Sequence, residues 1–252
     1  MLADLKDKAV LITGSSTGIG AAVAIGFGAV GARITVHGNT NVEAAKSVAR
    51  KVRAAGGIAS VSIGDLTAHG TVERVVQEHI ANHGQLDILI NNAGSLVERV
   101  AVGDVTDELC SRVIDVNLRQ VVNMCCVALP FIRETTGTII NTGSIAANNG
   151  GGIGIALYAG TKGFVASWTR SLALELAREG IRVNCVSPGV VDTAIHSQTP
   201  PEVLERVRQT IPFNRFGNAE ECVGAYLFLA SAAMSSYVTG QTIEVNGGQH
   251  FS

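Results

Sequence analysis

Charge of either sign is scarce in this sequence and nearly balanced. Charged residues make up 16% of the 252 residues, and 19 Lys and Arg stand against 21 Asp and Glu, for a net charge of −2. Nucleic-acid binding needs a dense basic stripe, so we expect no nucleic-acid partner. Long hydrophobic runs are also missing, since no apolar stretch reaches the roughly 18 residues that span a bilayer. The charged start MLADLKDKAV differs from a signal peptide. We therefore expect a cytoplasmic protein without a membrane partner.

Cysteines are few and follow no pattern. The five form an odd number, and none belongs to a C-x-x-C motif. They are predicted to be buried, reduced thiols, as is usual in the cytoplasm. A redox pair formed by the neighbours Cys125 and Cys126 stays an alternative. Adjacent residues on a helix point about 100° apart, however, which favours a role in packing.

Candidate metal ligands are sparse as well. His79 and His83 have the i,i+4 spacing of a zinc pair, but the run His-Ile-Ala-Asn-His lacks the glutamate of H-E-x-x-H and an obvious third ligand. We expect a solvated helix end and no metal, with a zinc pair as the alternative.

The sequence is rich in apolar residues, at 46%, and short β-branched runs alternate with amphipathic segments of helical length. Strands are predicted at 9–13, 33–37, 59–63, 86–90, 138–142, 182–186 and 242–245, and helices at 18–30, 41–55, 69–83, 107–134, 156–179 and 219–232. This alternation predicts an α/β fold, a doubly wound parallel sheet of about seven strands with helices on both faces. No linker divides the chain, so 1–252 is predicted to be a single domain. The proline-rich stretch at about 187–218 is predicted to be a substrate loop or lid.

A glycine-rich loop follows the first predicted strand and opens a helix. It reads Thr13-Gly14-Ser15-Ser16-Thr17-Gly18-Ile19-Gly20. Its glycines permit a sharp turn and a close approach to a pyrophosphate, at which the first helical N–H groups point. The spacing differs from G-x-G-x-x-G, so the loop's position favours a dinucleotide site over a simple packing turn.

With these motifs the sequence resembles the short-chain dehydrogenase/reductase family over nearly its whole length. The loop at 13–20 matches that family's T-G-x-x-x-G-x-G motif, and Asn91-Asn92-Ala93-Gly94 matches its N-N-A-G turn. Asp65 is similar to its adenine-contacting aspartate, and Pro188-Gly189 with Thr193 is similar to its nicotinamide-contacting stretch. The resemblance implies a Rossmann-type fold and an NAD or NADP cofactor. The residues implied to bind it are Gly14, Ser15, Thr17, Gly18, Ile19, Gly20, Gly38, Asn39, Asp65, Leu66, Asn91, Ala93, Gly94, Tyr158, Lys162, Pro188, Gly189, Val191 and Thr193.

Ser144, Tyr158 and Lys162 match the family's catalytic set, and Asn117 matches its helix asparagine. Tyr158 and Lys162 are four residues apart in a predicted helix, so both side chains leave one face. An ammonium near a phenol favours the phenolate and lowers its pKa from about 10, toward the range of a general acid or base. Ser144 follows a predicted strand at the edge where such sheets bind ligands, and is predicted to hold the substrate oxygen. The resemblance further implies that Lys162 holds the nicotinamide ribose and that Asn117 anchors a relay water.

The sequence departs from the family between Ser144 and Tyr158, where it has one residue more than most members. The extra residue is predicted to lie in the glycine-rich segment 148–154 as a bulge or wider turn. The substrate pocket is predicted from 95–97, 145–157 and 190–212. Its partly apolar surface is predicted from Ile195, Pro212, Phe213 and Phe216, and His196 is the histidine expected to reach a substrate.

The end of the second predicted strand discriminates NAD from NADP. Family members that prefer NAD usually carry Asp where Gly38 stands, and members that prefer NADP often carry Arg where Asn39 or Thr17 stands. Without an acid, nothing repels a 2′-phosphate, and neutral donors are expected from Asn39, Thr40 and Ser15. His37 is expected to add charge at low pH. The sequence therefore favours NADP over NAD, with use of both left open.

Together these patterns predict an NAD(P)-dependent oxidoreductase. The predicted reaction interconverts a ketone, 3-oxoacyl compounds included, and a secondary alcohol by hydride transfer. Two alternatives stay open: a dinucleotide-sensing binding protein of the same fold without turnover, and a dehydratase or epimerase. The resemblance also implies a homotetramer built through 238–248 and the helices at 107–134 and 156–179.

Overall fold

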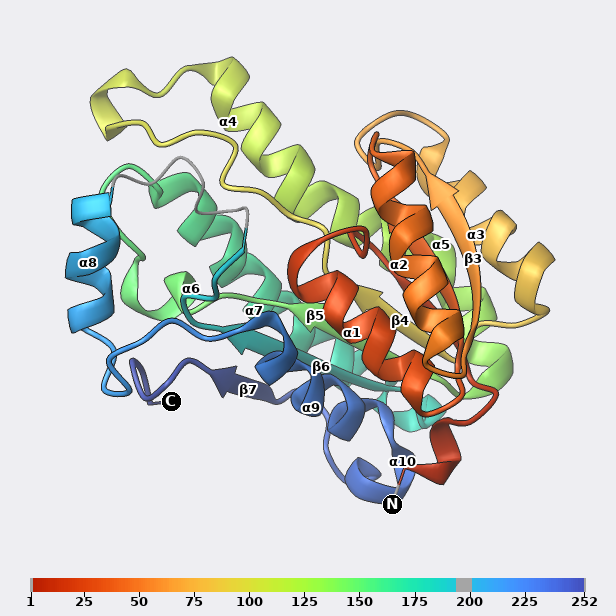
Figure 1. Ribbon diagram of the computed structural model, residues 1–252. Helices are drawn as coiled ribbons and strands as arrows, with labels where there is room; N and C mark the ends of the chain where they lie inside the picture. Colours follow the sequence, from red (N-terminus) through yellow and green to blue (C-terminus); the bar gives the residue numbers. More distant parts are fainter. Residues whose placement is uncertain (1, 194–200, 252) are drawn as a thin grey trace.

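The computed structural model describes residues 2–193 and 201–251 (Figure 1). One sheet of seven strands forms its centre: β1 (Ala9–Ile12), β2 (Arg33–Gly38), β3 (Ile58–Ile63), β4 (Ile88–Asn91), β5 (Thr138–Thr142), β6 (Arg182–Pro188) and β7 (Thr242–Val245). The strand order is β3-β2-β1-β4-β5-β6-β7, and every neighbouring pair is parallel. The predicted doubly wound parallel sheet is confirmed.

Helices cover both faces of this sheet. In the described residues they are α1 (Gly18–Ala29), α2 (Val42–Ala54), α3 (Thr71–His83), α4 (Asp107–Ile114), α5 (Gln120–Thr135), α6 (Ala146–Asn149), α7 (Ala156–Leu176), α8 (Pro201–Gln209), α9 (Ala219–Ala230) and α10 (Ala232–Ser235). Short turns of other helix types are η1 (Ala3–Leu5), η2 (Val102–Asp104), η3 (Asp115–Arg119) and η4 (Ala177–Glu179). One face packs against α1, α2 and α9, and the other against α3, α5 and α7.

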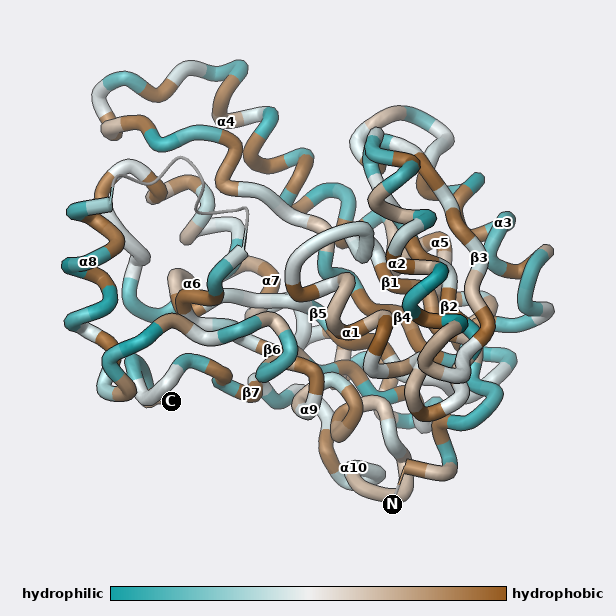
Figure 2. Tube along the Cα trace, viewed as in Figure 1, coloured by the Kyte–Doolittle hydropathy of each residue, from teal (hydrophilic) through white to brown (hydrophobic). Residues whose placement is uncertain are grey.

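The strands are apolar along their length because both faces are covered. Every residue of β1, β4 and β5 is buried. Figure 2 shows apolar residues along the central strands and polar residues on the outer sides of α2 and α3. This double burial explains why the strand sequences are continuous apolar runs rather than alternations. The strand order reverses between β1 and β4, and ligands of open α/β sheets bind beside such a point.

The structure corrects two predicted segments. The predicted helix 107–134 is split into α4 and α5 by η3, a π-helical turn that contains Asn117. The Asn117 Nδ2 donates to the Val113 carbonyl at 3.0 Å, so a side chain takes a position in the helical hydrogen-bond ladder. The predicted irregular stretch 187–218 contains the end of β6 and the helix α8, with Pro201 at the first position of that helix.

The solvated helix end predicted for His79 and His83 is wrong. Both side chains are buried between α3 and the outer strands. The His79 Nδ1 pairs with the Thr35 hydroxyl at 2.8 Å, and the His83 Nε2 pairs with the Ser60 hydroxyl at 2.9 Å. Over residues 2–193 and 201–251, no three His, Cys, Asp or Glu side chains gather as a metal site. The pair is a buried polar contact between helix and sheet.

This burial makes a prediction for acid stability. Burial lowers the pKa of His79 to about 3, the charges of His83 and Arg33 add to the effect, and Asp87 opposes it. The unfolded chain therefore takes up a proton between pH 6.5 and 3 that the folded chain refuses, so stability falls as the pH falls through that window. We expect His79→Leu to reduce the stability difference between pH 7 and pH 5 by about 2 kcal/mol in urea unfolding. The exposed His69 gives the matched control, since His69→Leu should keep the wild-type difference. An unchanged difference in His79→Leu would contradict this account.

The cysteines follow the predicted pattern only in part. All five are free, and Cys125, Cys185 and Cys222 are buried as expected. Cys126 is exposed and Cys110 is half-buried, because both lie on the outer sides of their helices. Cys125 and its neighbour point in different directions, which matches packing rather than a redox pair.

One helical stretch in the described residues, Asp107–Thr135, is long and apolar enough to cross a membrane by length and composition. Its residues Val121, Met124 and Ile132 are buried in the core against the sheet. Its apolar character is that of a core helix.

Candidate active site

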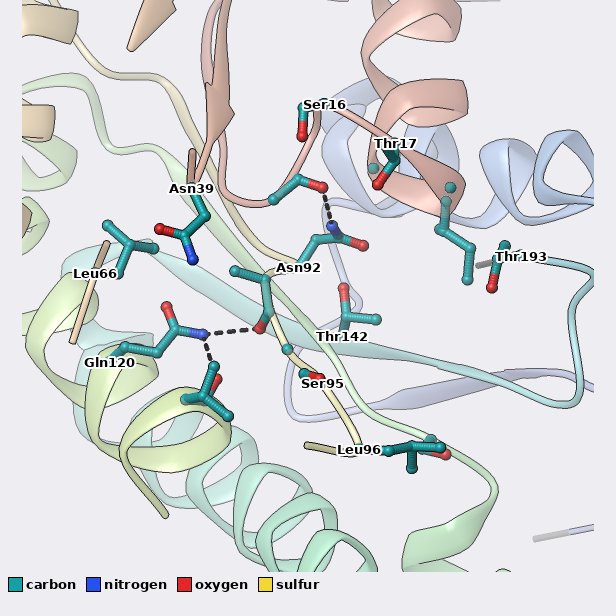
Figure 3. Close-up of a pocket in the computed structure, with 18 of the residues that line it drawn as sticks. Ser16, Thr17, Asn39, Leu66, Asn92, Ser95, Leu96, Gln120, Thr142 and Thr193 are labelled. Carbon is teal, nitrogen blue, oxygen red and sulfur yellow. Dashed lines mark hydrogen bonds between the residues drawn. The ribbon is translucent and has the colours of Figure 1, made fainter. Parts of the chain in front are cut away.

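A cavity of about 440 Å³ opens at the carboxyl ends of the central strands. Figure 3 shows Asn39 and Leu66 toward one end of it and Thr193 toward the other. Most of the predicted cofactor residues line it: Gly14, Thr17, Gly18, Ile19, Gly20, Asn39, Asp65, Leu66, Ala93, Gly94, Tyr158, Lys162, Pro188, Gly189, Val191 and Thr193. The fold thus brings together residues from most of the length of the chain.

The glycine loop is held by the turn that follows β4. The Thr13 hydroxyl accepts from the backbone N–H groups of Asn92 and Ala93, each at 3.0 Å. The Asn92 side chain donates to the Gly14 carbonyl at 3.1 Å (Figure 3). A Cβ at Gly20 would lie 2.4 Å from the Asn92 Nδ2, so only glycine permits this packing. The loop is therefore fixed before any ligand binds.

His37 joins the glycine loop to the ends of two strands. Its Nδ1 accepts from the Gly14 N–H at 3.1 Å and therefore carries no proton, so its Nε2 donates to the Gly64 carbonyl at 3.0 Å. Burial lowers its pKa, and the Gly64 carbonyl opposes this only in part. This imidazole positions the loop, and its lowered pKa makes the charge that was expected from it at low pH harder to form.

The three predicted catalytic side chains lie together in the cavity wall. Ser144 lies just past β5, while Tyr158 and Lys162 lie on the first turns of α7. The Lys162 Nζ donates to the Thr142 carbonyl at 2.8 Å and lies 5.7 Å from the centre of the Tyr158 ring. A Cβ at Gly94 would lie 2.9 Å from the Asn117 Oδ1, so the glycine leaves room for that amide.

Burial controls the protonation of this site. It raises the pKa of Tyr158, and the Ser144 hydroxyl acts in the opposite direction. It lowers the pKa of Lys162 to about 8, with Cys185 opposing. The expected net lowering of the Tyr158 pKa is not found, because burial of the phenol outweighs the opposing contacts. A neutral phenol is a proton donor, which suits the reduction of a carbonyl.

Asn117 is buried and does not line the cavity. Its Oδ1 accepts from the Ser95 N–H at 3.0 Å, and its Nδ2 donates to the Ser95 carbonyl at 2.8 Å. Both ends of its amide are therefore engaged by the segment that follows Gly94. Asn117 acts as a positioning residue for that segment, and its predicted relay water stays a prediction.

Three other predicted residues also lie outside the cavity lining. The Ser15 hydroxyl donates to the Ile12 carbonyl and accepts from the His37 N–H. Asn91 donates to the Asn141 Oδ1 at 2.9 Å within the sheet. Gly38 lies behind Ser16, because a Cβ there would be 3.2 Å from the Ser16 Cβ. Ser15 and Gly38 therefore pack within or behind the loop, and Asn91 pairs inside the sheet.

Sequence reasoning missed Gln120, which lines the cavity from α5. Its Nε2 donates to the Ala93 and Val116 carbonyls, while its Oε1 is buried without a partner (Figure 3). Its position three residues after Asn117 in the same predicted helix was the available signal.

The predicted substrate surface is only partly found. Ser95 and Leu96 line the cavity as expected. Phe213 is 69% exposed and lines a separate hollow with Ile211 and Gly247, while Pro212 and Phe216 do not line the cavity. Ile195 and His196 lie outside the described residues. The glycine-rich segment turns after α6, with Gly150, Gly151 and Gly154 at positive φ, and the placement of the extra residue there stays a prediction.

Comparisons with known proteins agree with this geometry. A family model described as Enoyl-(Acyl carrier protein) reductase matches residues 14–250. The chain is similar to the 3-oxoacyl-(acyl-carrier-protein) reductase FabG of Chlamydia muridarum, with 35% identity over 250 residues, 97% of this chain and 98% of the relative. It is similar to 3beta-hydroxysteroid dehydrogenase 1 of Eggerthella lenta, with 37% identity over 253 residues, 98% of this chain and 95% of the relative. Among solved structures, NADH-dependent reductase A1-R′ complexed with NAD has a TM-score of 0.90 and 36% identity, covering 100% of both chains.

Proposed function

Because this chain belongs to the short-chain dehydrogenase/reductase family of oxidoreductases, we propose that it reduces ketones to secondary alcohols with a nicotinamide dinucleotide. The observation that carries the proposal is the meeting of Ser144, Tyr158 and Lys162 in the wall of a cavity that begins at the glycine loop. The similarity to a 3-oxoacyl reductase supports 3-oxoacyl compounds as candidate substrates.

The cavity fits a dinucleotide in shape and in donor chemistry. The N-terminus of α1 faces it, and the N-cap residue Thr17 makes no side-chain cap hydrogen bond there. The unpaired N–H groups of such a helix end favour an anion, as a pyrophosphate is. Asp65 lines the adenine end that the resemblance assigns to it, and Lys162 lines the opposite part with Tyr158.

In the proposed reaction the chain supplies the proton and holds the carbonyl. A bound reduced nicotinamide supplies a hydride to the carbonyl carbon. The Tyr158 phenol donates its proton to the carbonyl oxygen, so that one hydride and one proton convert C=O to CH–OH. The Ser144 hydroxyl holds that oxygen, and the buried Lys162 ammonium stabilises the phenolate that remains. Asn117 keeps the Ser95 segment in place beside them.

For the cofactor we propose use of both NADP and NAD, with NADP preferred. Asp65 is the only carboxylate among the described residues that line the cavity, and it follows β3 rather than β2. The neutral groups Asn39 and Ser16 line the end beside β2, while Ser15 is bonded elsewhere and His37 is neutral. The absence of an acid beside β2 supports NADP, and the absence of a cation there limits the preference.

The direct test follows the absorbance of reduced nicotinamide with ketones, 3-oxoesters, sugars and steroid-like substrates, using both cofactors. We expect consumption of cofactor with at least one ketone class. Cofactor binding, seen by fluorescence titration, without consumption for any substrate would favour the dinucleotide-sensing alternative.

We further propose a cytoplasmic location, which suits five free thiols.

We also propose that the chain forms a homotetramer. Val121, Met124 and Leu172 are buried within this chain, against the sheet. They therefore give no support for an interface between subunits. What remains is Phe164, which stacks on the half-buried Trp168 at 5.9 Å, and Leu174, which is 82% exposed elsewhere on α7. We expect light scattering at micromolar concentration to give about four times the 26.1 kDa chain mass. A monomer would refute the assembly.

A further inference from the structure

A second, apolar pocket of about 300 Å³ adjoins the active-site cavity. Leu96 and Tyr158 line both, so the two spaces are neighbours beside the catalytic ring. The other walls come from the segment that leads into α4, from α4 itself and from the start of α7, and Figure 1 shows this segment standing away from the sheet. Its apolar lining includes Val100, Val105, Leu109, Val113, Ile155 and Leu157.

The lining of this pocket is chemically uniform. Within residues 2–193 and 201–251, Glu98 is the only charged residue of this lining, and its carboxylate is exposed and lies 3.8 Å from the Arg112 guanidinium. A hydroxylated chain would lose hydrogen bonds to water here without gaining protein partners, whereas a hydrocarbon chain would gain burial. The pocket therefore favours a hydrocarbon chain over a hydroxylated one.

The pocket is held open by its own framework. The Val100 N–H donates to the Gly154 carbonyl at 2.9 Å, and an Arg99 guanidinium nitrogen donates to the Ile153 carbonyl at 3.3 Å. Val97 has φ 62°, an unusual conformation for a β-branched residue, and its N–H donates to the Ser95 hydroxyl. These contacts turn the chain so that both Leu96 and Val100 line the pocket, and such strain is typical of functional segments.

We propose that this pocket binds an unbranched apolar chain attached to the substrate carbonyl, so that the protein selects aliphatic ketones by chain length. The inference rests on the proposed function, because Tyr158 must act on the carbonyl while the chain extends past its ring. The shared residues Leu96 and Tyr158 favour this occupant over a side chain from a second copy of the protein.

The test is a series of methyl ketones from butanone to decanone, assayed with NADPH and NADH. Each methylene buried is worth about 0.8 kcal/mol, so kcat/KM should rise about fourfold per methylene until the pocket is full. Turnover that is equal along the series would overturn the pocket and leave the proposed function intact.

Substitutions in the lining test whether the dependence of kcat/KM on chain length arises in this pocket. Val105→Phe adds a ring to its lining and should lower the ratio of kcat/KM for decanone over butanone at least tenfold. Leu109→Ala should move the plateau to longer chains. Ile58→Phe, at a 56% exposed residue at the start of β3, is the matched control and should keep the wild-type ratio. An unchanged ratio in both Val105→Phe and Leu109→Ala, or a changed oligomeric state with an unchanged ratio, would contradict the proposal.

Calorimetry separates this inference from the proposed function. Decanone should bind wild type and bind Val105→Phe at least tenfold more weakly, whether or not it is turned over. Binding without turnover of any ketone would contradict the proposed function alone. Equal binding to wild type and Val105→Phe, or no binding to wild type, would contradict the pocket.

Discussion

Tyr158→Phe is expected to lower kcat by about 10²–10⁴-fold, the contribution of a positioned general acid. The substitution keeps the ring, which packs with Ala146 and Ile155, and removes only the oxygen that donates the proton. Cofactor affinity, measured by fluorescence titration, should therefore stay within a few-fold of wild type. A loss of kcat without a loss of binding separates proton transfer from assembly of the site.

Tyr237 provides the matched control for this change. Its side chain is fully exposed, so Tyr237→Phe removes the same atom far from the cavity and should leave kcat unchanged. If Tyr158→Phe kept activity within a few-fold of wild type, Tyr158 would not be the proton donor.

Gly38→Asp is expected to reverse the proposed cofactor preference. Its Cβ would meet the Ser16 Cβ at 3.2 Å and the Ile63 Cδ1 at 3.3 Å, so small shifts of two side chains accommodate it. The new carboxylate would stand beside Ser16 and Asn39, where the ribose 2′ position is expected. Repulsion of a 2′-phosphate should lower kcat/KM with NADPH by about 10- to 100-fold, while kcat/KM with NADH changes little or rises.

Gly38→Asn distinguishes charge from size, since it adds nearly the same volume without a charge. We expect it to retain most of the NADPH activity that Gly38→Asp loses. Equal losses in the two variants would show that crowding of Ser16 is responsible. A wild-type protein that already prefers NADH by about a hundredfold would contradict the argument from the missing acid.

The fold and the cofactor loop could be predicted from the sequence because both depend on local chemistry. Buried parallel strands require continuous apolar runs, and a turn such as that at Gly14 and Gly18 requires glycine at positive φ. The order of the motifs along the chain then placed Ser144, Tyr158 and Lys162 at one sheet edge. These features are visible without knowledge of what packs against them.

Features that depend on packing between distant segments were not predictable. The sequence around His79 and His83 is compatible with a surface helix. Their partners come from neighbouring strands, the Thr35 hydroxyl for His79 and the Ser60 hydroxyl for His83. The rise in the pKa of Tyr158 comes from burial, which a motif does not reveal. The sequence placed 95–97 and 145–157 in a substrate pocket, but the wall that residues 98–113 add to the apolar pocket forms only in the folded chain.

The central claim is that a hydride reaches a carbonyl carbon while Tyr158 protonates its oxygen. The most direct measurement uses a reduced cofactor deuterated at the transferable position of the nicotinamide, with the product analysed by mass spectrometry. The account predicts an alcohol with one deuterium on the carbinol carbon, one oxidised cofactor per alcohol formed, and almost no labelled product from Tyr158→Phe. A product without deuterium, formed with no net change in the cofactor, would contradict the account and indicate a dehydratase or an epimerase.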